Sequence, residues 1–275
     1  MSPSVGAVLA AARHVDAGIG VRDARLLLQQ VLGATHADLA THPERELPAD
    51  ALARFSALAA RRVAGEPLAY LLGRREFHGI DFEVSAAVLI PRPETELLVE
   101  MAAAAAGAGT ARILDLGTGS GCIAVALARL LPRAQVTAVD ASAEALEVAC
   151  RNAARHRVPL RLLRGDWFAA VGAEQFDLIV ANPPYVADGD PHLIEGDLRF
   201  EPRRALASGK DGLDDLRRIV GAAPRHLVSG GRIFVEHGYD QADAVAALLR
   251  GAGFVDLVHH TDLAEIPRVA GGRRP

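Results

Sequence analysis

The stretch Phe176–Tyr185 constrains the fold of this chain most. An apolar, β-prone run, Leu178-Ile179-Val180-Ala181, stops at Asn182, and Pro183 and Pro184 follow at once. Proline fixes its own φ and pushes the preceding residue out of the helical region, so the pattern predicts a buried strand that ends in a stiff loop. Because proline has no N–H, this loop offers many acceptors and few donors. By itself the loop 182–185 is typical of an ordinary or proline-rich turn. A glycine-rich turn upstream, at residues 117–121 and called the glycine turn below, instead favours a catalytic loop for a planar NH2 group.

A second strand and turn lie upstream. Residues 111–116 predict a compact apolar strand, and residues 122–131 predict a helix. The turn between them contains the candidate cofactor-binding residues Asp115, Gly117, Thr118, Gly119, Ser120 and Gly121. Glycines let a ligand approach the backbone closely, and a helix N-terminus adds free N–H groups. Cys122 stands where the dinucleotide fingerprint needs its third glycine, which weakens a nicotinamide interpretation.

Two further candidates end the next two strands. Residues 135–139 predict a strand ending at Asp140, about 20 residues beyond the glycine turn, where an acid can accept hydrogen bonds from ribose hydroxyls. Asp140 could instead cap the helix that begins near Ser142, although Ser142 can do so itself. Residues 160–163 predict another strand, followed by the only tryptophan, Trp167. Its ring could flank an adenine or pack in the core, and both interpretations stay open.

The rest of the chain alternates strands and helices. A helix is expected over residues 215–227, a strand over 231–238, a helix over 241–249 and a last strand over 254–259. This alternation is typical of an α/β fold with a parallel-type sheet covered on both faces.

The N-terminal part of the chain has a different pattern. Residues 4–66 read as short helices, with Asp23 expected to cap a helix over 24–32 and Pro48 to open one through Val63. Residues 76–84 predict a hairpin around Gly79. We therefore predict a helical domain over residues 1–73 and a hairpin linker plus catalytic domain over 74–275. The helical domain could complete the core or dock a macromolecular partner.

Composition limits the classes of function. A net charge of -4 gives no global signal for nucleic acid, and no apolar run is long enough to span a membrane. Cys122 and Cys150 are the only cysteines and do not have the spacing of metal ligands. We therefore expect a cytoplasmic protein with no metal, no membrane association and no direct nucleic-acid partner.

These motifs together carry a resemblance. The glycine turn, Asp140, Asp166-Trp167 and Asn182–Tyr185 resemble S-adenosylmethionine-dependent methyltransferases of the Rossmann-like class that act on a planar amino nitrogen. The chain is more specifically similar to the glutamine-N5 methyltransferases of peptide chain release factors. That similarity also includes Arg75-Glu76-Phe77, Ile90–Glu96, Glu201-Pro202-Arg203 and Asp211-Gly212-Leu213-Asp214.

The resemblance implies a fold and a site. It implies an N-terminal helical bundle, a linking hairpin and a mostly parallel seven-stranded sheet. It also implies S-adenosylmethionine as cofactor, S-adenosylhomocysteine as product, and the glutamine of the Gly-Gly-Gln motif of class I release factors as target. In such a site the glycine turn holds the methionine end, Asp140 the ribose, Trp167 the adenine, and Asn182, Pro183, Pro184 and Tyr185 the glutamine side chain. The chain departs from the family near its end, where Asp262-Leu263-Ala264 is followed by Glu265-Ile266-Pro267 instead of glycine.

The loop Asn182–Tyr185, called the acceptor loop below, has chemistry that agrees with this target. An amide nitrogen is a poor nucleophile, so a site must orient it and oppose the positive charge that develops on it. The Asn182 side-chain oxygen and the Pro183 carbonyl can bind its two hydrogens, and Tyr185 can pack against the flat amide. No carboxylate base is strictly required, because the alkylated nitrogen is acidic enough to lose its proton to water.

Three other functions use part of the same pattern. A ribosomal-protein glutamine methyltransferase shares the chemistry, but the Arg92–Glu96 run favours the release-factor branch. Methylation of adenine N6 or guanine N2 in nucleic acid also presents a conjugated NH2, although no basic or aromatic module is evident. A dehydrogenase or a nucleotide-binding protein needs the glycine turn but has no use for the acceptor loop.

Overall fold

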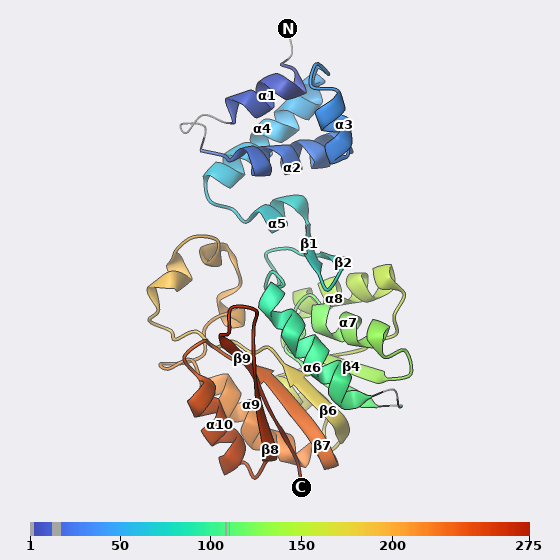
Figure 1. The fold of residues 1–275 in the computed structure, drawn as a ribbon, viewed down its shortest axis with the longest axis vertical. Helices are drawn as coiled ribbons and strands as arrows, with labels where there is room; N and C mark the ends of the chain where they lie inside the picture. Colours follow the sequence, from blue (N-terminus) through green and yellow to red (C-terminus); the bar gives the residue numbers. More distant parts are fainter. Residues whose placement is uncertain (1–2, 13–17, 108, 110) are drawn as a thin grey trace. The chain divides into compact units, whose positions relative to one another are not determined.

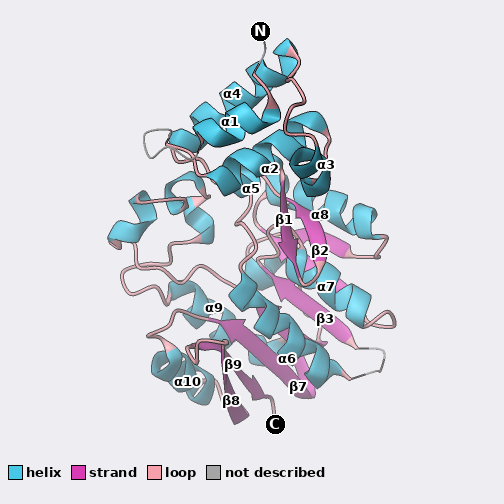
Figure 2. Ribbon diagram, turned by 45° about the horizontal axis from the view of Figure 1, so that its top comes forward, coloured by secondary structure: helices cyan, strands magenta, loops and turns pink. Residues whose placement is uncertain are grey.

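The computed structural model describes residues 3–12, 18–107, 109 and 111–275. Within this part of the chain, the residues form compact units over Met1–Arg74 and Arg75–Pro275. Strands are found in the second unit, whereas the first is helical (Figure 2).

The first unit is a small helical bundle. Its helices are α1 (Val5–Ala11), α2 (Val21–Leu32), α3 (His36–Thr41), α4 (Ala49–Val63) and α5 (Leu68–Leu72). Their apolar faces form a separate core around Leu27, Leu28 and Leu47. Asp23 does not cap α2 as expected, because the helix begins at Val21, three residues earlier than expected, with Gly20 as its N-cap. Asp23 lies in the first turn and pairs with Arg62 at 2.7 Å.

The second unit contains the hairpin and a larger sheet. The hairpin pairs β1 (Arg74–Phe77) with β2 (Ile80–Glu83). The strands of the sheet are β3 (Arg112–Leu116), β4 (Gln135–Asp140), β5 (Arg161–Arg164), β6 (Phe176–Ala181), β7 (Leu227–Glu236), β8 (Val255–Thr261) and β9 (Pro267–Arg273). The helices are α6 (Glu96–Ala106), α7 (Cys122–Leu130), α8 (Ala143–His156), α9 (Asp214–Ala222) and α10 (Ala242–Gly251).

The sheet is doubly wound. In the described part of the chain it has seven strands in the order β5-β4-β3-β6-β7-β9-β8. Strands β3 to β7 pair in parallel, and β9 lies antiparallel between β7 and β8. Helices α6 and α7 pack on one face and α9 and α10 on the other (Figure 1). The expected mostly parallel seven-stranded sheet is therefore confirmed, and both of its faces are covered.

Two of the expected elements near the C-terminus are wrong in their extent. The helix expected over 215–227 ends at Ala222, where a 3-10 turn containing Pro224 replaces it. Strand β7 then begins at Leu227 rather than at Gly231, because a shift in its register with β6 carries the strand past the glycines. The sequence suggested a break at those glycines, but an irregularity of this kind lets a strand continue.

Strand β9 was not predicted from its own residues, although the resemblance implied a seventh strand in the sheet. Its sequence contains Gly271 and Gly272, which weaken a strand signal. In the sheet these glycines are required by packing. A Cβ on Gly271 would lie 2.5 Å from the Phe234 ring, and one on Gly272 would lie 2.8 Å from Leu257 Cδ2.

Candidate active site

The pairing of the strands brings the predicted motifs to one edge of the sheet. Leu116, the last residue of β3, is in register with Val139 on one side and with Ala181 on the other. The chain after β3 continues toward β4, whereas the chain after β6 continues toward β7. The ends of β3 and β6 therefore form the topological switch point of the sheet, which is where open α/β sheets bind ligands.

The glycine turn is held in a conformation that needs its glycines. Gly117, Gly119 and Gly121 all have positive φ, at 75°, 55° and 80°. The backbone N–H groups of Gly117 and Thr118 both donate to the Val139 carbonyl, at 2.9 and 3.0 Å. The space beside Gly119 where a Cβ would lie is open, so a ligand can approach that backbone.

Asp115 lies beneath the turn rather than on the surface of the site. Its side chain is fully buried, and its Oδ2 accepts a hydrogen bond from the Thr118 hydroxyl at 2.6 Å. Burial raises the pKa of Asp115 to about 7, and the nearby charge of Asp140 acts in the same direction. Asp115 therefore contacts the glycine turn through Thr118 and does not line the cavity described below.

Asp140 is held in place by two backbone N–H groups, and Ser142 rather than Asp140 caps α8. Its Oδ2 accepts from the Gly119 N–H and its Oδ1 from the Ser142 N–H, each at 2.8 Å. Ser142 caps α8 through the Ala145 N–H. The carboxylate of Asp140 also lines the cavity described below, so its orientation is fixed before any ligand binds.

Trp167 is partly buried and strained. Its φ is +49°, an unusual value for a bulky residue and one that is often found at functional sites. The indole Nε1 donates to Asp215 Oδ1 at 3.1 Å, and the ring contacts the position beside Gly117. The ring lines the cavity, so it is not simply a core residue.

The Asn-Pro-Pro-Tyr loop is split between the cavity and the interior. Asn182 and Pro184 line the cavity. Pro183 is buried and does not belong to its wall, and neither does Tyr185, whose hydroxyl donates to Glu236 Oε1 at 3.3 Å. Burial raises the pKa of Tyr185, and the charge of Glu236 adds to this effect. Tyr185 is therefore a neutral donor that is turned toward the end of β7.

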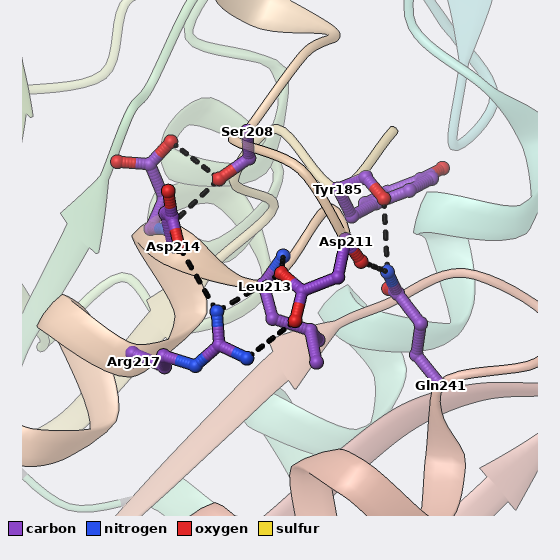
Figure 3. Close-up of polar contacts among 8 residues, drawn as sticks. Tyr185, Ser208, Asp211, Leu213, Asp214, Arg217 and Gln241 are labelled. Atoms are coloured by element: carbon purple, nitrogen blue, oxygen red, sulfur yellow. Dashed lines mark hydrogen bonds and ion pairs between the residues drawn. The ribbon is translucent and has the colours of Figure 1, made fainter. Parts of the chain in front are cut away.

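The segment after the loop is tied back to it by Gln241. The Gln241 Nε2 donates to the Tyr185 carbonyl at 3.0 Å and to the Asp211 carbonyl at 3.4 Å (Figure 3). Arg217 then pairs with Asp211 and Asp214. Gly212 fits between these groups because it has no side chain, since a Cβ there would lie 2.2 Å from the Tyr185 carbonyl oxygen. This packing is the structural role of the Asp211–Asp214 motif.

Glu201 also holds the segment between the acceptor loop and α9 against the rest of the domain. Its side chain is fully buried, accepts from the Ile90 N–H at 2.9 Å and forms an ion pair with Arg92. Glu96, in the same run as Arg92, accepts from the His78 N–H at 2.9 Å and so holds the hairpin. The Arg92–Glu96 run thus makes structural contacts, through Arg92 with Glu201 and through Glu96 with the hairpin.

The sequence interpretation missed three residues beside the loop. Thr95 is buried, and its hydroxyl accepts from Asn182 Nδ2 at 3.0 Å. Glu236 is 1% exposed at the end of β7, and burial raises its pKa to about 7. Gln241 was assigned only to a helix start. The signal for Glu236 was present, because it ends a buried strand just as Asp140 and Asn182 do.

Part of this set of residues surrounds a cavity of about 360 Å³. That volume is within the usual range for small-molecule sites, roughly 300–1,000 Å³. The cavity is lined by residues 117–120 of the glycine turn, Asp140, Trp167, Asn182 and Pro184. An open backbone, an oriented acid and an aromatic ring suit the methionine, ribose and adenine parts of S-adenosylmethionine. No set of three His, Cys, Asp or Glu side chains is grouped for metal binding in the described residues.

A family model and a solved structure identify the class of protein to which the second unit belongs. A family model described as Methyltransferase small domain matches residues 93–242, which contain the glycine turn and the acceptor loop. A solved structure titled as a methyltransferase from Pyrococcus furiosus has a TM-score of 0.55 at 19% identity, over 80% of this chain and 98% of that one, and shows the same fold. The second unit is an S-adenosylmethionine-dependent methyltransferase domain.

The family follows from longer matches. Residues 9–73 match the model described as PrmC N-terminal domain. The chain is 51% identical to "Release factor glutamine methyltransferase" of Burkholderia pseudomallei, over 100% of this chain and 98% of that protein. It is 52% identical to the protein of the same name from Bordetella pertussis, over 94% and 96%. The chain belongs to the release factor glutamine methyltransferase family. No helix in the described residues has the length and apolarity to cross a membrane.

Proposed function

We propose that this enzyme methylates the side-chain nitrogen (N5) of the glutamine in the Gly-Gly-Gln motif of class I peptide chain release factors. The observation that carries the proposal is the position of Asn182, whose amide lines the same cavity as the glycine turn. The full-length relatives bear the name of this activity. Because release factors act during translation, the enzyme is placed in the cytoplasm.

The cofactor is S-adenosylmethionine, which supplies an electrophilic methyl group when bound. Residues 117–120 of the turn, where the space beside the Gly119 backbone is open, would hold its methionine end. Asp140 accepts hydrogen bonds from the ribose hydroxyls, and Trp167 flanks the adenine. No metal takes part in this proposal.

The acceptor loop holds the glutamine. Asn182 Nδ2 is bound to Thr95, so the Asn182 Oδ1 is the end of the amide that is left to accept from the substrate NH2. Pro184 bounds the site, whereas Pro183 lies outside the cavity wall and is given no contact with the substrate. The Asn182 dipole is fixed before the reaction and opposes the charge that grows on the nitrogen. Tyr185 supports the loop from behind through Glu236, rather than by stacking from the cavity side.

The N-terminal unit is proposed as a docking module for the protein substrate. Its apolar residues form a core of their own, so the unit is not needed to complete the core of the methyltransferase domain. A substrate motif exposed on a large protein needs recognition outside the cavity, and a separate helical unit can provide it.

One assay tests the proposal against its alternatives. Purified enzyme is incubated with methyl-labelled S-adenosylmethionine and either a class I release factor, ribosomal proteins, DNA or RNA, and the modified residue is located by mass spectrometry. We expect label on the Gly-Gly-Gln glutamine alone. Label on a ribosomal-protein glutamine, or on adenine or guanine, would replace the proposal with one of the alternatives.

A further inference from the structure

The indole of Trp167 is held by a carboxylate to which the proposed function gives no role. Asp215, in the first turn of α9, accepts from the Trp167 Nε1–H through its Oδ1 at 3.1 Å. Both side chains line the cavity together with Gly117 of the glycine turn. An indole N–H can only donate, so a partly buried indole at this position needs an acceptor, and Asp215 provides it.

The second oxygen of Asp215 is occupied as well. Its Oδ2 accepts from the Ser208 hydroxyl at 2.9 Å, and the Ser208 oxygen in turn accepts from the Asp215 backbone N–H at 2.8 Å. Ser208 is 3% exposed and is fixed by its own N–H, which donates to the Val186 carbonyl at 2.9 Å. Arg218 makes a longer contact with Oδ1, at 3.4 Å. The carboxylate is therefore oriented before any ligand binds.

Trp167 needs this support, because its backbone is in a conformation that a bulky residue rarely adopts. Its φ is +49°. The six-membered part of its ring lies against the glycine turn, with Cζ3 and Cη2 at 3.1 and 3.4 Å from the place where a Cβ would stand on Gly117. The ring is thus held by the turn along one edge and by Asp215 at its nitrogen.

A general preference of helices for acids in the first turn does not explain the orientation of Asp215. Asp214 lies in the same turn of α9 and has the same favourable interaction with the helix N-terminus. Its side chain is 61% exposed and pairs with Arg217 on its own helix at 2.9 Å. The side chain of Asp215 is only 19% exposed and is turned to the indole and to Ser208. The two neighbours therefore separate the effect of the charge from the effect of the contact.

We propose that Asp215 is a positioning residue for the cofactor, which holds the Trp167 indole in place at the cavity while Ser208 fixes the carboxylate. This inference rests on the proposed function for the place of the adenine beside Trp167. The contact itself can be measured in the protein without any ligand. The expected effect of Asp215 is on cofactor affinity and not on methyl transfer, because its side chain makes no hydrogen bond to the acceptor loop.

The direct test uses the fact that Trp167 is the only tryptophan in the chain. Protein labelled with ¹⁵N gives one indole N–H resonance, which reports this hydrogen bond in the absence of ligand. In Asp215→Ala we expect the proton to move upfield and to exchange faster with water. Asp214→Ala removes an acid from the same turn and should leave the resonance unchanged. Asp215→Asn keeps the size of the side chain and one acceptor oxygen and should show a smaller change, so the test does not depend on the folding of Asp215→Ala.

Cofactor affinity provides the second test. Calorimetry with S-adenosylhomocysteine should show a Kd roughly 10-fold higher in Asp215→Ala, because a hydrogen bond to a charged group is lost. Asp214→Ala should stay within about twofold of the wild type. Trp167→Phe keeps a ring but removes the N–H, and in that background Asp215→Ala should add less than about twofold. Losses that multiply would show that Asp215 acts on the cofactor by another route and would overturn the inference.

Kinetics separate this role from a loss of structure. With the release factor as substrate, Asp215→Ala should raise the KM for S-adenosylmethionine roughly 10-fold, while kcat at saturating cofactor and the KM for the release factor change less than about twofold. A lower kcat with an unchanged KM for the cofactor, or an unchanged indole resonance, would contradict the inference. If the release factor is not methylated at all, the proposed function fails, while the resonance and the binding of S-adenosylhomocysteine still decide the role of Asp215.

Discussion

Replacing Glu236 should make the protein more stable above about pH 7. Its pKa is raised from 4.5 to about 7, chiefly by burial. A difference of this size between the folded and unfolded states corresponds to about 3 kcal/mol, at roughly 1.4 kcal/mol per pH unit. Because the folded pKa is the higher one, the contribution of this group to stability is fully present below pH 4.5. It is lost as the pH rises to about 7 and is constant above that.

Glu236→Gln removes this titration while keeping the size of the side chain. We expect the variant to match the wild type near pH 4.5 and to exceed its free energy of unfolding by about 3 kcal/mol at pH 8. Asp115 also has its pKa raised to about 7, but it is present in both proteins and cancels in their difference. The difference curve therefore isolates Glu236.

Urea unfolding between pH 4.5 and 8.5, followed by tryptophan fluorescence, measures this curve. Trp167 is the only tryptophan and belongs to the same compact unit as Glu236, so the signal reports the relevant unit even if the helical unit unfolds separately. Glu147→Gln, which removes a charge at an exposed position on α8, is the control variant. If the difference in the free energy of unfolding between Glu236→Gln and the wild type does not change with pH, then ionisation of Glu236 does not destabilise the folded protein. The argument from the burial of Glu236 would then fail.

Three further predictions concern the loop, the glycine turn and the C-terminal hairpin. Asn182→Ala should lower the single-turnover rate of methyl transfer about 10²-fold to 10³-fold at saturating cofactor, and a near wild-type rate would remove it from its role. Gly117→Ala and Gly119→Ala should both weaken S-adenosylmethionine binding in calorimetry, and unchanged binding in both would contradict the role of the turn. Both positions have positive φ; a Cβ at Gly117 would meet the Trp167 ring at 3.1 Å, and one at Gly119 would fill the open space that the cofactor is proposed to occupy. Glu265→Gly should raise the free energy of unfolding by up to about 1 kcal/mol, since Glu265 has φ +61°; a lower urea midpoint would contradict this.

The parallel half of the fold could be predicted because its signals are local. Each strand from β3 to β6 is a short apolar run that ends at a polar or glycine residue. The positions of Gly117, Asp140 and Asn182 at one edge then follow from the parallel pairing. Strand β9 could not be predicted in this way, because its glycines are needed by side chains from neighbouring strands that are distant in sequence.

The C-terminal segment in which this chain departs from the pattern of the resembled family forms the turn between β8 and β9. Asp262 accepts from the Ala264 and Ile266 N–H groups and pairs with Arg268, so the turn between β8 and β9 is well tied. Glu265 occupies a left-handed position in this turn, a conformation that favours glycine. A glutamate there places a conformational cost on the turn.

Which end of the Asn182 amide faces the cavity could not be read from the sequence, and that choice decides the chemistry. Asparagine offers a donor at one end and acceptors at the other, and only the oxygen can bind a substrate NH2. The motif fixes the backbone of the loop, but the amide is oriented by Thr95, 87 positions earlier, whose hydroxyl accepts from Asn182 Nδ2 and leaves Oδ1 as the free acceptor.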